Sequence, residues 1–146
     1  DYDVDGATST ALLLRYFAQL GLPATYYIPD RMTEGYGPNA PALQKLHRAG
    51  VRLALTVDCG ISAFGPLEAA HAAGLDVIVL DHHLGSSLLP KAAAVVNPNR
   101  LDETSPHKHL AAVGVCFLFT VALSAALEQA GFFQRHPRPD LLSLLD

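Results

Sequence analysis

Acidic residues alternate at the start of the chain, in the string Asp1-Tyr2-Asp3-Val4-Asp5-Gly6. In an extended backbone Asp1, Asp3 and Asp5 would point to one side, where their carboxylates would repel one another. Two carboxylates at ~4 Å repel by roughly 4 kcal/mol at an effective dielectric constant of ~20, and a divalent cation offsets that repulsion most directly. The spacing favours a metal site, with an acidic turn in which Asp5 or Thr8 caps a helix as the alternative.

The next residues, Gly6 to Ser9, lead into a helical pattern of apolar residues. A helix N-terminus binds anions through N–H groups that have no partner inside the helix. We therefore expect Thr8 and Ser9 to contact substrate phosphate or the surroundings of the metal, with simple helix capping as the alternative.

Polar residues also follow directly on short apolar segments, and a parallel sheet would gather such residues at one edge. The segments and the residues after them are Ala24–Ile28 with Asp30 and Arg31, Leu53–Val57 with Asp58, Val77–Leu80 with Asp81-His82-His83, and Ala92–Val96 with Asn97. Carboxylates with one or two imidazoles suit Mn²⁺ or Mg²⁺, and the nitrogen ligands favour Mn²⁺. Two such ions would activate water for attack on phosphorus, with Asp58 as the candidate bridging ligand. Arg31 is a predicted phosphate contact, with a surface salt bridge as the alternative. Asn97 is predicted to contact substrate or to support the residues around the metal, with an Asn-Pro turn as the alternative.

Helical patterns alternate with these apolar segments along the chain. The expected helices cover residues 7–20, 42–49, 65–73 and 109–130, with a further helix starting at 140–146; loops cover 32–39, 84–91 and 101–107, and a linker covers 132–139. This order predicts an α/β fold, a three-layer α/β/α domain with a mainly parallel sheet covered on both faces. We expect the helix over 109–130 to be buried.

The composition agrees with one domain over residues 1–146, because half of the residues are hydrophobic and 16% are charged. The net charge of −4 gives no obvious nucleic-acid footprint. No apolar run reaches the length of a membrane span, and no signal peptide is seen. Cys59 and Cys116 lack metal-binding spacing and suit buried thiols of a cytoplasmic protein. Both ends look cut, so we expect a domain of a longer protein.

Five strings, taken in order, resemble the DHH phosphoesterase superfamily. They are Asp3-Val4-Asp5-Gly6-Ala7-Thr8-Ser9, Ile28-Pro29-Asp30-Arg31, Glu34-Gly35-Tyr36-Gly37, Val57-Asp58-Cys59-Gly60 and Asp81-His82-His83. Within that superfamily the chain resembles, over nearly its whole length, the RecJ family of single-strand-specific 5′→3′ DNA exonucleases. The resemblance implies a DHH catalytic domain acting in DNA repair and recombination, with the family's DHHA1-type and OB-fold domains absent from this chain.

The resemblance also implies roles for individual residues. The implied metal ligands are Asp3, Asp5, Asp58, His82 and Asp146, with Asp1 as a further candidate near the ions. His83 would face the scissile phosphate, and Asp81 would orient a histidine rather than bind metal. The implied partner is single-stranded DNA, with a single-strand-binding protein or a helicase binding through regions not in this chain.

Other functions fit parts of the pattern. A DHH hydrolase of oligoribonucleotides or cyclic dinucleotides would need the same metal site. The string from Asp30 to Gly37 favours a member of the RecJ family over such a hydrolase. A catalytically inactive DHH-derived binding protein would lack some of the acids or histidines, which this chain keeps. A receiver domain with Asp58 as phosphoacceptor leaves the Asp-His-His string without a role.

Overall fold

The computed structural model describes residues 2–145 and contains a three-stranded parallel sheet. Strands β1 (Leu53–Val57), β2 (Asp76–Leu80) and β3 (Ala94–Val96) lie in that order. In register, Val57 pairs with Leu80 and Leu80 pairs with Val96, so the strands end level with one another. The residues after the three strands therefore stand side by side at one edge of the sheet.

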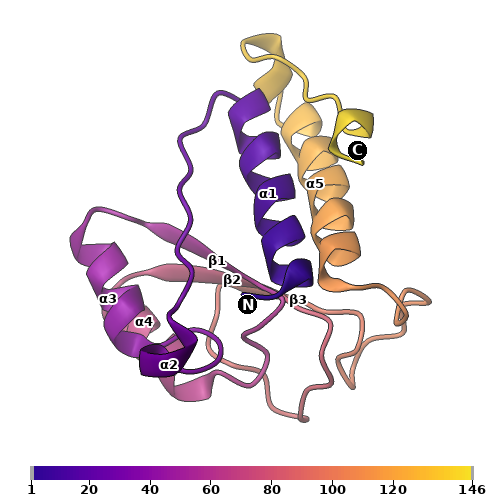
Figure 1. The fold of residues 1–146 in the computed structure, drawn as a ribbon. Coiled ribbons are helices and arrows are strands. Elements are labelled where there is room, and N and C mark those ends of the chain that lie inside the picture. Colours follow the sequence, from indigo (N-terminus) through magenta and orange to yellow (C-terminus); the bar gives the residue numbers. More distant parts are fainter. Residues whose placement is uncertain (1, 146) are drawn as a thin grey trace.

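Helices cover both faces of the sheet (Figure 1). Helices α1 (Val4–Gln19) and α5 (Ala112–Gln129) pack side by side on one face, and α3 (Ala40–Arg48) and α4 (Phe64–Ala72) lie on the other. The short helix α2 (Arg31–Glu34) and two 3₁₀ turns, η1 (Phe132–Gln134) and η2 (Leu142–Leu144), complete the elements of residues 2–145. The predicted α/β/α fold is confirmed.

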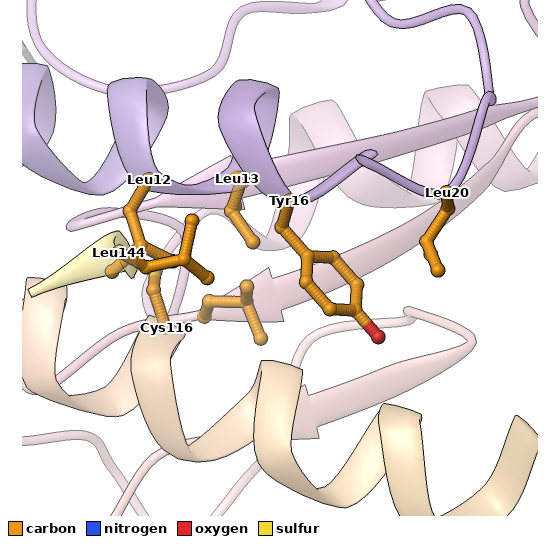
Figure 2. Packing of buried hydrophobic residues seen from close by; sticks show 7 residues of the cluster. Leu12, Leu13, Tyr16, Leu20, Cys116 and Leu144 are labelled. Atoms are coloured by element: carbon orange, nitrogen blue, oxygen red, sulfur yellow. The ribbon is translucent and has the colours of Figure 1, made fainter. Parts of the chain in front are cut away.

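The alternation of side chains along β2 divides the core into two clusters. Leu80 contacts the cluster between α1 and α5, whereas Val77 and Val79 contact the cluster under α3 and α4. Figure 2 shows the first cluster, where Leu12, Leu13, Tyr16 and Leu20 of α1 lie with Cys116 of α5 and Leu144. The side chain of Tyr16 is fully buried and its hydroxyl lies 2.8 Å from Ser124 Oγ, so α5 provides a partner for this polar group.

The N-terminal stretch differs from the sequence-based expectation. Helix α1 begins at Val4, not Ala7, so the described part of the acidic string is not an extended strand with Asp3 and Asp5 on one side. The N-cap is Asp3, not Asp5 or Thr8, because Asp3 Oδ1 accepts the N–H groups of Asp5 at 2.9 Å and Gly6 at 3.0 Å. Residues two apart do not share a helix face, so Asp5 is turned toward α5 instead.

The segment Ala24–Ile28 was predicted as a strand, and this prediction is wrong. The segment is exposed, and a cavity of about 630 Å³ lies between it, α1, α3 and β1. A strand needs a neighbour within hydrogen-bonding distance, and no neighbour pairs with this segment in the described chain. Its β-branched and aromatic residues alone do not form a ladder.

Smaller differences concern loops and helix ends. The predicted loop over 32–39 contains most of α2, and the predicted linker over 132–139 contains η1. The predicted helix at 140–146 is only the single turn η2 within the described residues. Helix α5 is long and apolar enough to cross a membrane, with a mean hydropathy of 1.7, but it packs on α1 and β2. It is buried on one face only, because Leu118 and Val121 are about two-fifths exposed.

The packing of α4 on the sheet makes a stability prediction. Leu67 has no exposed surface, so Leu67→Ala leaves a cavity and should lower the free energy of unfolding by about 2–5 kcal/mol. Leu88, which is 72% exposed in a loop, is the matched control, and Leu88→Ala should change stability by less than about 0.5 kcal/mol. Urea titration measures both, and equal losses in the two variants would contradict the assigned core.

Candidate metal centre

Three side chains that could hold a metal ion meet where β1 and β2 end. Asp58, His82 and His83 each offer one ligand atom, and these atoms lie within 4.8 Å of one another. Asp58 follows β1 directly, and the two histidines follow Asp81 after β2. The parallel register places the two strand ends next to each other, and the sequence-based expectation of a polar cluster at this edge is confirmed for these residues.

The ring of His82 is oriented by the backbone. Its Nδ1 lies 3.1 Å from the carbonyl oxygen of Leu110, which only accepts hydrogen bonds, so Nδ1 carries a proton. The other nitrogen, Nε2, lies 3.2 Å from Asp58 Oδ1 and 3.6 Å from Asp5 Oδ2. A neutral ring would turn a lone pair toward two carboxylates, which is unfavourable unless a proton or a cation lies between them. This arrangement fits a divalent metal held by one imidazole nitrogen and carboxylate oxygens.

Asp5 also joins the two helices on this face of the sheet. Its carboxylate accepts the backbone N–H groups of Ala112 at 2.7 Å and Val113 at 2.8 Å. The residue before α5, Ala111, has no side chain that could cap the helix, so Asp5 supplies the cap from a distant part of the chain. These two hydrogen bonds and the partial positive charge of the helix end stabilise a carboxylate next to other carboxylates.

Asp58 adopts an unusual backbone conformation. Its φ of +59° is the only positive value at a non-glycine position in residues 2–145. A non-glycine residue in this region costs on the order of 1–3 kcal/mol and persists where the surroundings impose it. The Asp58 N–H donates to Leu80 O at 2.9 Å, which continues the β1–β2 ladder by one bond beyond the strand. The strained turn directs the side chain toward His82.

The electrostatics of Asp58 and Asp3 differ although the two carboxylates are neighbours. Burial raises the pKa of Asp58, and the charges of Asp5 and Asp3 raise it further, against the two histidines. The pKa of Asp3 is lowered, first by the hydrogen bond from the Gly6 N–H. The charged form of Asp3 is therefore favoured, whereas that of Asp58 is disfavoured. A cation at the cluster would remove this penalty for Asp58.

Asp81 is completely buried, and its carboxylate contacts the two histidines that follow it in the chain. Its Oδ1 accepts the backbone N–H groups of His82 at 2.7 Å and His83 at 3.1 Å, and lies 2.7 Å from His83 Nδ1. Its Oδ2 accepts the Ile61 N–H at 2.9 Å. Both oxygens are therefore occupied, which agrees with the predicted role of orienting a histidine.

Two asparagines hold the backbone of the histidines. Asn97 Nδ2 donates to His83 O at 2.9 Å, and its Oδ1 accepts the Asn99 N–H at 2.7 Å. Asn99 Nδ2 donates to His82 O at 2.6 Å and to Lys108 O at 3.2 Å. Of the two roles predicted for Asn97, support of the residues around the metal agrees with these bonds, whereas contact with substrate does not, because Asn97 is buried and its amide is used within the protein.

The other predicted substrate contacts lie in different environments. Ser9 is fully buried beside Cys116 between α1 and α5, so the prediction that it contacts substrate is not supported. Thr8 is exposed, and its hydroxyl donates to Val4 O at 2.7 Å. Arg31 is exposed, and its guanidinium carbon lies 5.0 Å from the centre of the Tyr2 ring. The substrate roles of Thr8 and Arg31 stay predictions.

Asp1 and Asp146, both predicted near the ions, lie outside the described residues. Sequence reasoning missed two groups of the site, the carbonyl of Leu110 and the amide of Asn99. It named Tyr36 within the string Glu34-Gly35-Tyr36-Gly37 but did not assign its hydroxyl, which donates to Asp58 O at 3.2 Å. Asn99 carried a signal too, since asparagines of this kind favour turns that hold backbone groups.

Comparisons with known proteins agree with the geometry. The family model "DHH family, N-terminal domain" matches residues 1–145. The single-stranded-DNA-specific exonuclease RecJ of Escherichia coli is 42% identical over 149 residues, which cover 100% of this chain and 26% of that protein. RecJ of Bacillus subtilis is 44% identical over 127 residues, which cover 87% of this chain and 16% of that protein. The chain thus spans about a quarter or less of these relatives.

Solved structures give the same result. A crystal structure of exonuclease RecJ bound to manganese matches with a TM-score of 0.76 and 39% identity, over 87% of this chain and 32% of that one. RecJ of Thermus thermophilus in complex with Mn²⁺ matches with a TM-score of 0.68 and 35% identity, over 95% of this chain and 18% of that one. Manganese is one of the two metals that the sequence predicts.

The unfavourable buried charge of Asp58 yields a prediction for the stability of the metal-free protein. Asp58→Asn removes a buried charge that burial and two carboxylates disfavour, so the midpoint of thermal unfolding should not fall without metal. Mn²⁺ at about 100 times its dissociation constant should raise the midpoint of the unchanged protein by about 5–10 °C, and that of the variant much less.

The control for this comparison is Asp76→Asn, since Asp76 is exposed at the opposite edge of the sheet. Asp76→Asn should keep the full response to Mn²⁺. A normal response in Asp58→Asn would mean that Asp58 is not a ligand.

Asp81→Asn should damage the site through its hydrogen bonds. An amide has one accepting oxygen, so in either orientation an NH₂ group faces at least one N–H donor in a fully buried place. The free energy of unfolding should fall by about 1–3 kcal/mol, measured by urea titration of the metal-free protein. Stability equal to that of Asp76→Asn would contradict the assigned network.

Proposed function

Because the chain belongs to the DHH family, we propose that it is the catalytic domain of a metal-dependent phosphodiesterase that degrades single-stranded DNA as a 5′→3′ exonuclease of the RecJ type. The observation that carries the proposal is the position of His82 Nε2, 3.2 Å from one carboxylate and 3.6 Å from a second, with its tautomer set by a backbone carbonyl. The RecJ relatives, which are named as single-stranded-DNA-specific exonucleases, support the choice of substrate.

The residues present fit two Mn²⁺ or Mg²⁺ ions. Asp58 and His82 would be shared or central ligands, and Asp3 and Asp5 reach the same cluster from the start of α1. Asp1 and Asp146 are proposed as further ligands by the family resemblance. Bound divalent ions lower the pKa of water and offset negative charge on a phosphate. The carboxylates hold their positions without rearrangement, because backbone N–H groups already bind Asp3 and Asp5.

His83 is placed to act on the substrate. Its ring is half-exposed, while Asp81 Oδ1 holds Nδ1 at 2.7 Å, so the Nε2 side is oriented by a buried anion. A proton on Nε2 would make His83 a donor to a phosphate oxygen, where negative charge grows during the attack of water. Asp81 fixes the ring through its contact with Nδ1, and the exposed Arg31 and Thr8 are proposed phosphate contacts.

We assign the remaining properties of the whole protein on the same basis. Residues 1–146 form the catalytic domain, and DHHA1-type and OB-fold domains elsewhere in the protein would bind most of the DNA strand. That division is consistent with the net charge of −4 of this chain. A single-strand-binding protein or helicase would bind outside these residues, and we propose a role in DNA repair and recombination and a cytoplasmic location.

The test uses the intact protein with Mn²⁺ and compares 5′-labelled single-stranded DNA, duplex DNA, dinucleotides and cyclic dinucleotides. We expect release of mononucleotides from the 5′ end of single-stranded DNA. Asp58→Ala should lower this activity at least about a hundredfold, since metal ligands supply several kcal/mol of transition-state stabilisation. Asp76→Ala is the matched control and should leave the activity unchanged.

Three outcomes would overturn the proposal. Faster turnover of dinucleotides or cyclic dinucleotides than of long DNA would assign the chain to the other DHH hydrolases. Wild-type nuclease activity in Asp58→Ala would exclude the metal mechanism, and binding of DNA without hydrolysis would indicate an inactive binding protein.

A further inference from the structure

Tyr36 contacts the metal cluster from the loop between α2 and α3, which contains none of the predicted metal ligands. Its hydroxyl donates a hydrogen bond to the carbonyl oxygen of Asp58 at 3.2 Å. The residue is 57% exposed, whereas Asp58 is buried. The hydroxyl is therefore turned inward to the backbone of Asp58.

The hydrogen bond from Tyr36 is the second bond that holds the backbone of Asp58. The Asp58 N–H is bound by Leu80 O at 2.9 Å, and the Asp58 carbonyl is bound by Tyr36, so both backbone polar groups of this residue are held. Asp58 has a φ of +59°, a conformation that L residues leave when nothing holds them. A rotation of this backbone would move the carboxylate away from His82.

The loop around Tyr36 is itself held in place. Glu34 accepts hydrogen bonds from the Tyr27 hydroxyl, from the Asp30 N–H at 2.8 Å and from Asn39 Nδ2 at 3.2 Å. Gly35 and Gly37 flank Tyr36 with φ values of +78° and +77°, which other residues rarely adopt. The loop therefore presents Tyr36 to Asp58 in a defined position.

We propose that Tyr36 is a positioning residue whose hydroxyl holds the strained backbone of Asp58, so that the Asp58 carboxylate faces His82 and the metal. The part of this inference that concerns catalysis rests on the proposed nuclease function. The part that concerns the metal does not, since the ligand geometry can be measured without DNA. Contact of the Tyr36 ring with a DNA base is the competing role.

The experiment compares Tyr36→Phe and Tyr36→Leu in the intact protein. Tyr36→Phe removes the hydroxyl and keeps the ring, whereas Tyr36→Leu removes both. Tyr26→Phe is the matched control, because Tyr26 is 63% exposed on the segment between α1 and α2. Three quantities are measured: Mn²⁺ affinity by calorimetry without DNA, the midpoint of thermal unfolding without metal, and kcat and KM on single-stranded DNA.

Loss of one hydrogen bond to Asp58 should weaken Mn²⁺ binding about three- to tenfold in both Tyr36 variants. The value of kcat at saturating Mn²⁺ should fall by a similar factor, KM for DNA should stay within about twofold, and Tyr26→Phe should match the unchanged protein. The thermal midpoint shows that the variants are folded, so a weaker affinity for Mn²⁺ is not a consequence of unfolding.

Two results would overturn the inference. Unchanged Mn²⁺ affinity in folded Tyr36→Phe would mean that the hydroxyl does not position Asp58. A higher KM in Tyr36→Leu alone would assign the ring to DNA binding. If the unchanged protein binds Mn²⁺ and does not cleave DNA, the proposed function fails, and the Mn²⁺ affinities still decide the role of Tyr36.

Discussion

Repulsion among the carboxylates of Asp3, Asp5 and Asp58 is the constraint on which the site depends. The protein offsets the charge of the first two with backbone N–H groups, from the first turn of α1 and from the start of α5. Asp58 receives no such backbone bond among the interactions described, and its raised pKa reflects burial and its acidic neighbours. The negative charge of Asp58 therefore stays uncompensated in the folded chain, and a bound divalent cation offsets it. Metal binding should stabilise the folded state for this reason.

The same contacts serve the fold and the site. Asp3 caps α1, and Asp5 caps α5, so the helices on one face of the sheet begin at the metal cluster. The strained turn at Asp58 ends β1, and the buried Asp81 organises the turn after β2. A change of Asp3, Asp5 or Asp81 would affect both structure and chemistry, since each of these carboxylates accepts backbone N–H groups.

The strand ends were predictable because the apolar runs are short and polar residues follow them at once. Leu53–Val57 is the strand that the sequence indicates, and Asp58 and His82 meet because parallel strands end level with one another. The role of Ser9 was not predictable, since its burial depends on the direction of α1 against α5. Contacts such as that of Tyr36 with a backbone carbonyl leave no pattern in a sequence, because any residue offers the acceptor.

The hydrogen bonds from Ala112 and Val113 to Asp5 join residues that are 107 and 108 positions apart. Translation proceeds from the N-terminus at about 5–20 residues per second, so Asp5 leaves the ribosome several seconds before the N–H groups that hold it. During that interval Asp5 lacks its two backbone donors, and the cluster is incomplete. The group of acids at the edge of the sheet is therefore complete only once α5 has been synthesised and has docked on α1.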